Sequence, residues 1–216
     1  MEKLTSILEI IYFLSGPALV IAAIYGLKQL KLASEQNKQI WQTRILNSTR
    51  EAYTLAGDQC KYYLENIIPL LNKLDQIIKD KNLDFFEKSE VKIEGKQISV
   101  KPYMADNSLD KVFEECLEEL HTVVNYIEGF SVFFVSGVAA DNVGFNTLGR
   151  TYTSSVKRLL PFIIPFSQDG TYKHTKSLFI TWYSRIEKDN LLKEKAEVEK
   201  KLKKQKSITI DTIGTK

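Results

Sequence analysis

The sequence predicts a mostly α-helical protein with one N-terminal transmembrane helix, followed by a cytosolic helical bundle that carries a small β-hairpin insertion. Three observations predict this fold class. Residues 10–27 contain no charged side chain, apolar residues recur at three- and four-residue steps through most of the remaining chain, and strict alternation occurs only within residues 90–101. The expected domains are residues 1–27 for the N-terminal segment and span, residues 28–186 for the helical domain, and residues 187–216 for a lysine-rich helical tail.

The uncharged run at residues 10–27 is the strongest single signal. At about 1.5 Å per residue, a helix of this length just crosses a hydrocarbon core of about 30 Å. Tyr12 and Tyr25 stand near its ends, where interfacial aromatic residues are typical. A cleaved signal peptide is the alternative, but acidic residues accompany the lysine before the run, and Lys28 follows it directly. We therefore expect a retained anchor.

The charges that flank the run predict its orientation. Lysine and arginine in short flanks stay on the cytoplasmic side of a membrane, so the amino end should face outward and residues 28–216 should be cytosolic. Cys60 and Cys116 fit a reducing compartment and are expected to be small apolar core residues. Only Lys3 precedes the run, whereas the basic residues that follow it are Lys28, Lys31, Lys38, Arg44 and Arg50.

Small residues in the predicted span favour close packing between transmembrane helices. Pro17 also removes one backbone hydrogen bond within the span and favours a kink. Two interpretations stay open: an ordinary anchor, and an oligomeric bundle that lines a pore. The residues assigned to packing or pore lining are Ser15, Gly16, Pro17, Ala18, Ala22, Ala23 and Gly26.

Beyond the span, apolar residues at helical spacing predict that the helix continues to about residue 68, as one long rod or as two stacked segments. Pro69 follows, and the helical pattern resumes over residues 70–78. Residues 90–101 then predict a two-stranded hairpin whose turn contains Gly95. Two strands are not stable alone in water, so the hairpin must pack against the helices or against a neighbouring subunit.

The second half of the chain predicts three further helices. The most strongly predicted one is expected over residues 108–137, from a serine that is typical of a helix start to a glycine that is typical of a helix end. A turn rich in Gly, Asn and Asp should follow, and then a helix over about residues 147–160 that Pro161 ends. The last helix is expected over about residues 176–206, apolar at its start and rich in lysine at its end.

No conventional catalytic or metal-binding motif occurs in the sequence, so we expect no enzymatic activity, no catalytic residues, no cofactor and no metal. The chain has two histidines, which leaves few candidates for histidine-based chemistry. His121 is expected at the solvent edge of a helix, and His174 in a loop near a basic cluster.

Glu128 interrupts the apolar helix and is the first candidate for a polar site. Burying an unpaired carboxylate is costly, so Glu128 should reach the solvent edge or find a partner, and Arg150 or Arg158 could supply an ion pair. The functional alternative places Glu128, Asp141 and Arg150 together in a ligand or subunit site.

Lysines concentrate near the carboxyl end and form the second interaction signal. Most charge runs are solvated helix faces, which is the simplest interpretation. Attraction to anionic lipid contributes about 1 kcal/mol per basic residue near a membrane surface and is the second interpretation. RNA binding is a third, although no stacking aromatics alternate with the lysines. The basic contact residues are Lys200, Lys201, Lys203, Lys204 and Lys206.

The order of these features carries a family resemblance. The chain has, in order, one amino-terminal span, a long emergent helix, a helix that contains I-E-G-F at residues 127–130 and ends in S-G-V at 136–138, and a closing helix with Trp182. This order resembles that of small bacterial single-pass membrane proteins. Within that group the chain is similar to the membrane accessory proteins of RNA-targeting type VI-B CRISPR systems. The resemblance implies a HEPN-like helical domain at the bacterial cytoplasmic membrane that assembles into a pore and strengthens antiphage defence.

The resemblance does not extend to nuclease chemistry. The HEPN signature places a histidine four to six intervening residues after an arginine, and none of the five arginines has one in that window. The expected function is therefore a non-enzymatic effector or accessory membrane pore, with membrane lipid and further copies of the chain as partners. The alternatives are a membrane-tethered scaffold that recruits a cytosolic protein through the hairpin and the basic tail, and a degenerate HEPN-type domain that binds RNA.

Overall fold

The structure is a computed structural model, and it describes the backbone of residues 2–167 and 169–204. Side chains are described for residue 19 and for residues 24–105, 107–167 and 169–203. The chain divides into two units, Met1–Glu51 and Ala52–Lys216. Helix α1 (Glu2–Tyr62) contributes to both units.

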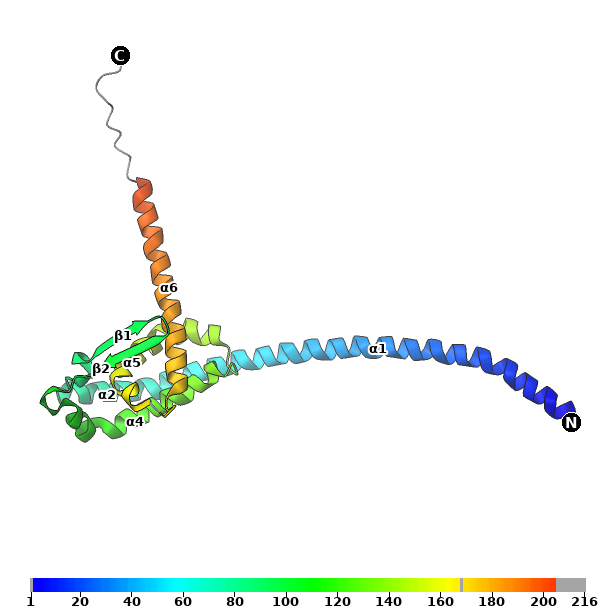
Figure 1. The fold of residues 1–216 in the computed structure, drawn as a ribbon, viewed down its shortest axis with the longest axis horizontal. Helices are drawn as coiled ribbons and strands as arrows, with labels where there is room; N and C mark the ends of the chain where they lie inside the picture. The colour runs from blue at the N-terminus through cyan, green and yellow to red at the C-terminus, as the bar shows by residue number, and fades with distance from the viewer. Residues whose placement is uncertain (1, 168, 205–216) are drawn as a thin grey trace, which may run out of the picture. The chain divides into compact units, whose positions relative to one another are not determined.

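In the first unit, α1 is the one element that the described residues form (Figure 1). The prediction that the helix continues beyond the apolar run is confirmed. All side chains from residue 27 to residue 51 are exposed. The large apolar ones are between 48% and 70% exposed, and they are Leu27, Leu30, Leu32, Ile40, Trp41, Ile45 and Leu46.

Among the residues whose side chains are described, no helix combines the length and the apolar character needed to cross a membrane. The predicted span at residues 10–27 falls mostly outside those residues, because only Leu19 and residues 24–27 of the run have described side chains.

The second unit contains the remaining helices and a hairpin (Figure 1). After α1, its elements are η1 (Tyr63–Ile67, a π-helical turn), α2 (Ile68–Asp80), α3 (Phe85–Lys88), β1 (Glu90–Glu94), β2 (Gln97–Lys101), η2 (Ala105–Asn107), α4 (Ser108–Val135), α5 (Asp141–Ile163), η3 (Pro165–Ser167) and α6 (Lys173–Lys204). Pro69 lies in the first turn of α2, where a helix tolerates the missing N–H group.

The predicted hairpin is confirmed. Val91 pairs with Val100 and Ile93 pairs with Ile98 in an antiparallel register. Gly95 begins the two-residue turn with a φ of +60°, a conformation that glycine adopts without steric cost. The inward side chains of both strands pack on the core, and both strands contact α5. The hairpin is therefore supported by packing against α5 of its own chain.

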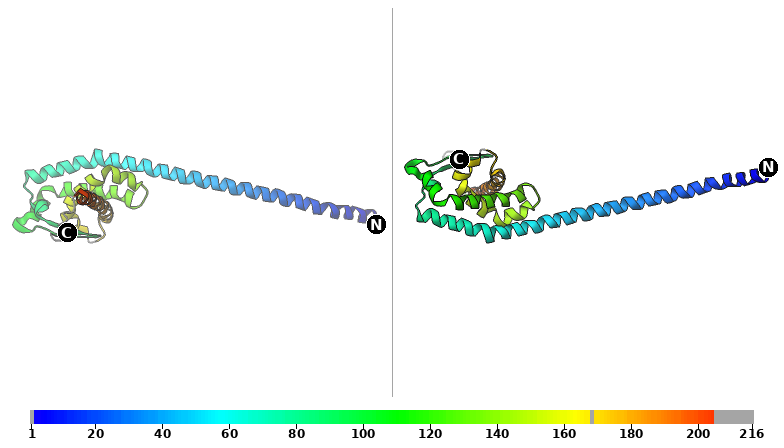
Figure 2. Two further views of the ribbon diagram at one scale, coloured as in Figure 1. Left: turned by 90° about the horizontal axis from the view of Figure 1, so that it is seen from above. Right: turned by 90° about the horizontal axis from the view of Figure 1, so that it is seen from below.

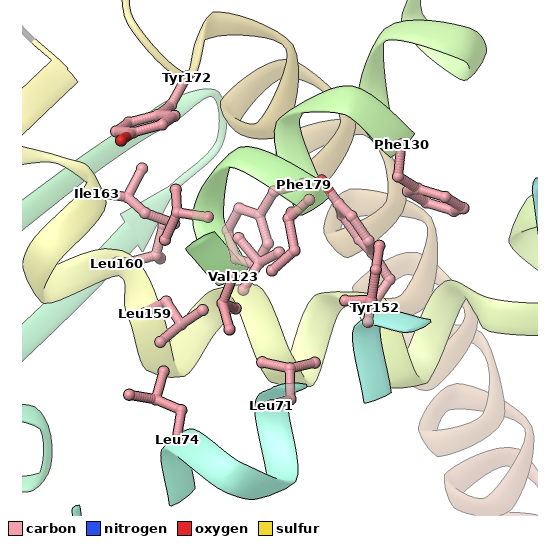
Figure 3. Close-up of a cluster of buried hydrophobic side chains, with 14 of the residues drawn as sticks. Leu71, Leu74, Val123, Phe130, Tyr152, Leu159, Leu160, Ile163, Tyr172 and Phe179 are labelled. Atoms are coloured by element: carbon pink, nitrogen blue, oxygen red, sulfur yellow. The ribbon is translucent and has the colours of Figure 1, made fainter. Parts of the chain in front are cut away.

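The core of the second unit is built mainly from α2, α4, α5 and α6 (Figure 3), and the end of α1, η1 and α3 also contribute buried side chains. Phe130 lies at the centre of an aromatic cluster, with ring centroids 4.9 Å from Tyr63, 5.6 Å from Tyr152 and 6.3 Å from Trp182. In Figure 2, α6 is seen end-on where α4 is seen along its length, so these two contacting helices cross steeply. Cys60 and Cys116 are buried free thiols, as expected.

Helix α5 differs from its prediction at both ends. It begins at Asp141 and not near residue 147, because the glycine that suggested a turn is a packing residue. A Cβ atom on Gly144 would lie only 2.3 Å from Cε1 of Phe134, so glycine lets α5 approach α4 closely. Pro161 does not end α5, which continues to Ile163 with Pro161 buried inside it.

The ends of the other long helices also differ in detail. Helix α6 begins at Lys173, a few residues before the expected start, and its described part ends at Lys204. Lys206 lies outside the described residues. Helix α4 reaches Val135 as expected, but its backbone leaves helical geometry at Cys116, so α4 is kinked there.

Removing a buried leucine from this core should destabilise the domain. Leu120 is 0% exposed on α4, so Leu120→Ala should lower the free energy of unfolding by about 2–5 kcal/mol through lost burial and a residual cavity. Urea denaturation of the full chain in detergent measures this change. Leu191→Ala is the matched control, because Leu191 is 62% exposed on α6 and its truncation should change the value by less than about 0.5 kcal/mol. Equal effects of the two variants would contradict the packing described for α4.

Candidate functional site

Glu128 on α4 lies at the amino end of α6 and accepts four hydrogen bonds there. Its Oε1 accepts from the backbone N–H of His174 at 3.1 Å and lies 2.7 Å from the ring Nδ1 of His174. Its Oε2 accepts from the backbone N–H of Thr175 at 2.8 Å and from the Thr175 hydroxyl at 2.7 Å. The first N–H groups of a helix have no partner within the helix, and Glu128 satisfies two of them.

The position of Glu128 at the amino end of α6 also stabilises its negative charge. The positive end of the α6 dipole faces the carboxylate. Burial by itself raises the pKa of Glu128, but the hydrogen bonds from Thr175 and His174 outweigh burial and lower the pKa below its usual value. The carboxylate therefore stays ionised in the folded protein and holds α6 against α4.

A buried hydroxyl network continues from this junction into the core. The Ser131 hydroxyl donates to the Ile127 carbonyl at 2.6 Å and lies 2.7 Å from the Tyr152 hydroxyl. The Tyr152 hydroxyl also lies 3.2 Å from the Thr175 carbonyl. Because Ser131 already donates to Ile127, the single proton of Tyr152 serves either Ser131 or Thr175. Burial raises the pKa of Tyr152 well above its usual value, so the phenol stays neutral. The network connects α4, α5 and α6 through buried polar groups that are partners of one another.

Asp141 makes a second polar contact between helices, at the start of α5. Its Oδ1 accepts a 2.8 Å hydrogen bond from the indole N–H of Trp182. Its Oδ2 pairs with the guanidinium group of Arg185, which also lies 5.2 Å from the ring centroid of Phe145. Asp141 therefore anchors α6 two turns after the junction at Glu128.

The structure does not bring Glu128, Asp141 and Arg150 together. Glu128 and Asp141 hold different parts of α6, and Arg150 is exposed on α5. The expected arginine partner of Glu128 is wrong, because Arg158 pairs with Asp75 at 2.5 Å and the start of α6 supplies the partner of Glu128. The expectation that His174 is a plain loop residue is likewise wrong, since His174 lies in the first turn of α6 against Glu128.

An open groove of about 500 Å³ lies between the end of α1 and the second half of α4, within the second unit. The rings of Tyr62 and Tyr126 are parallel to within 2°, and their centroids are 6.2 Å apart. These side chains are 38% and 40% exposed. We call this feature the tyrosine groove, and its lining residues are Gln59, Tyr62, Asn125, Tyr126, Gly129, Phe130 and Phe133.

The tyrosine groove was not predicted from the sequence. No group in its lining carries a charge at neutral pH, and Gly129 leaves open space where a larger residue would carry a side chain. Two signals could have pointed to it. Gly129 interrupts a strongly amphipathic helix, which costs stability and often has a packing or functional reason. Tyr126 stands one turn before it on the same face.

The predicted membrane and lysine residues are only partly described. Within the span, Gly26 has a described environment, with open space around the position of a Cβ atom. Ser15, Gly16, Pro17, Ala18, Ala22 and Ala23 have no described side chains. Lys200, Lys201 and Lys203 are exposed on α6, and the side chains of Lys204 and Lys206 lie outside the described residues.

The residues described here define a class: an α-helical domain whose hairpin packs on one helix and whose last helix is anchored by carboxylates from two others. Comparison of the chain with protein families, curated proteins and solved structures finds no match. The tyrosine groove and the exposed surfaces of α1 and α6 are therefore the basis for assigning a function.

Replacing Glu128 should loosen the junction at the start of α6. A glutamine can accept through one oxygen only and would turn its NH₂ group toward another donor, so Glu128→Gln should lower the free energy of unfolding by about 1–3 kcal/mol at pH 7. Glu118→Gln is the matched control, because Glu118 is an exposed carboxylate on the same helix. Chemical denaturation of both variants measures the difference.

The same junction gives a pH dependence. The folded-state pKa of Glu128 lies below the unfolded value of about 4.3, so its contribution is fully present above that pH and is lost as the pH falls through the lower, folded value. The free energy of unfolding of the wild type should therefore fall more steeply below about pH 4 than that of Glu128→Gln. If the free energy of unfolding of the two proteins fell in parallel with pH, the Glu128 carboxylate would not be stabilised by hydrogen bonds at the start of α6.

Proposed function

We propose that this protein is a single-pass membrane protein that works as a homo-oligomer, with residues 10–27 as its anchor. The observation that carries the proposal is the exposed apolar surface of α1 between residues 27 and 51. A helix in water needs a partner to cover such a surface, and a second copy of the same helix offers an equivalent one.

Part of this apolar surface follows a regular spacing. Leu30 and Trp41 are eleven residues apart, and Ile45 follows one helical turn later. An eleven-residue separation places Leu30 and Trp41 within about 20° of each other around the helix axis, so the two side chains share one face. We call Leu30, Trp41 and Ile45 the α1 stripe. It supports lateral pairing of α1 helices from different copies.

Membrane attachment is supported by the sequence. The run at residues 10–27 is uncharged, and basic residues follow it at once. The resemblance to the accessory proteins of type VI-B CRISPR systems extends the proposal to a cellular role, which is an effector or accessory pore in antiphage defence at the bacterial cytoplasmic membrane. The small residues of the span are consistent with the close helix contacts that an oligomeric pore requires.

A second candidate function is a membrane-tethered scaffold that recruits a cytosolic protein. The surface of α6 favours it, because the apolar side chains Leu191 and Leu202 are each 62% exposed on a helix that also carries exposed lysines. The hairpin does not add to this candidate, since its apolar side chains pack on its own core. Particle size in detergent separates the two candidates, because the scaffold does not require self-association.

The anchor predicts how the protein fractionates. The expressed chain should sediment with membranes and be extracted by detergent but not by carbonate or high salt, because an apolar helix is held by the hydrocarbon and not by charge. A tag placed before residue 1 should be accessible only from outside the cell. Recovery in the soluble fraction, or a processed amino terminus near Leu27, would contradict the anchor.

The α1 stripe predicts the oligomer. The detergent-solubilised protein should run as a discrete particle of more than two subunits, and the double variant Trp41→Ser with Ile45→Ser should reduce its size, because the stripe loses its apolar contacts. Light scattering coupled to size exclusion measures this. The double variant Ile40→Ser with Leu46→Ser is the control, since it removes two exposed apolar side chains of α1, 48% and 70% exposed, that lie outside the stripe. A monomeric wild type would overturn the proposal and favour the scaffold.

A further inference from the structure

We propose that the tyrosine groove binds a planar, uncharged heteroaromatic ring of the nucleobase type, which stacks on Tyr62 and Tyr126 and is hydrogen-bonded at its edge by Gln59 and Asn125. The proposal concerns a site in the second unit and depends neither on membrane insertion nor on self-association.

The two tyrosines provide the stacking surface. Their rings are parallel to within 2° and remain more than one third exposed, so exposed ring surface is available to a third ring beside the pair. The third ring does not enter between the tyrosines, because their centroids are 6.2 Å apart and two stacking contacts need about 7 Å. Nucleobases stack on such faces because every base has a π-face of its own. Loss of solvent and the nearby Tyr126 phenol both raise the pKa of Tyr62, so this wall of the groove stays uncharged at neutral pH.

Gly129 makes room for the ring. Nothing lies within 4 Å of the position that a Cβ atom on Gly129 would occupy, although the residue stands between aromatic neighbours on α4. Phe130 is buried beneath it, and Phe133 is half-buried beside it, so the base of the groove is apolar. A volume of about 500 Å³ lies within the range of ligand pockets, roughly 300–1,000 Å³.

The two amides provide the polar edge. Within the described part of the chain, the side-chain amides of Gln59 and Asn125 form no hydrogen bond to another residue. Each amide carries a donor and an acceptor next to each other. That pattern matches the edge of adenine, whose N6 donates and whose N7 accepts, which is why Asn and Gln recognise adenine in other contexts.

The absence of charged side chains from the lining of the groove restricts the kind of ligand that can bind there. Its lining contains no lysine, arginine or carboxylate. A phosphate group would gain no ion pair within the groove, and phosphate recognition in proteins depends on such cations or on helix amino ends. The ring itself should therefore carry the affinity, and adenosine and AMP should bind with similar strength.

The test uses the full chain in detergent and adenosine, AMP and ribose as probes, with binding followed by saturation-transfer NMR and calorimetry. Adenosine should bind saturably with a Kd below about 1 mM, AMP should bind within about threefold of adenosine, and ribose should not bind. Tyr126→Ala should raise the Kd for adenosine at least about fivefold, whereas Tyr126→Phe, which keeps the aromatic ring, should retain adenosine binding.

Gly129→Leu fills the groove and should abolish adenosine binding. Gly57→Leu is its matched control, because Gly57 is an exposed helical glycine on α1 with open space around it and is not part of the lining. Absence of saturable adenosine binding to the wild type would overturn the proposal, and so would equal binding by Gly129→Leu. These outcomes are independent of the oligomer test, since each experiment uses variants that leave the other surface intact.

Discussion

The carboxylate of Glu128 is the interaction on which the described domain depends most. It accepts hydrogen bonds from residues 46 and 47 positions later in the chain and thereby fixes where α6 begins. Without such a partner, the first buried N–H groups of α6 would be left unsatisfied at a cost comparable to a lost hydrogen bond each. The adjoining hydroxyls of Ser131 and Tyr152 extend this junction to α5, so three helices meet around polar groups that contact one another.

The aromatic core relies on α6 being held in this place. Trp182 is fully buried and follows the junction by two turns of α6, where its indole N–H donates to Asp141 and its ring packs on Phe134 and Tyr152. Two carboxylates from two different helices therefore set the position of α6 along and around its axis. Apolar burial supplies most of the favourable free energy, while the directed hydrogen bonds select one arrangement of the helices.

The two units of the chain use apolar side chains in different ways. In the second unit they form a core and leave the tyrosine groove partly open, and in the first unit those from residue 27 to residue 51 stay exposed on one helix. Exposed apolar surface of this extent is typical of regions that meet a membrane or another protein. The division accords with a protein whose helical domain folds around its own core and whose first helix acts through partners outside the chain.

The sequence by itself determined the helices and the hairpin, because these depend on local periodicity: apolar residues every three or four positions from residue 108, and alternation around Gly95. Periodicity did not predict the start of α5 correctly, because a glycine at position 144 is typical of a turn. Only the contact with Phe134 shows that Gly144 is needed for close packing of two helices. Only the tertiary structure decided the partner of Glu128 and the pairing of Tyr62 with Tyr126. Both depend on residues far apart in the chain, whose contact is set by how helices cross and not by any spacing along one helix.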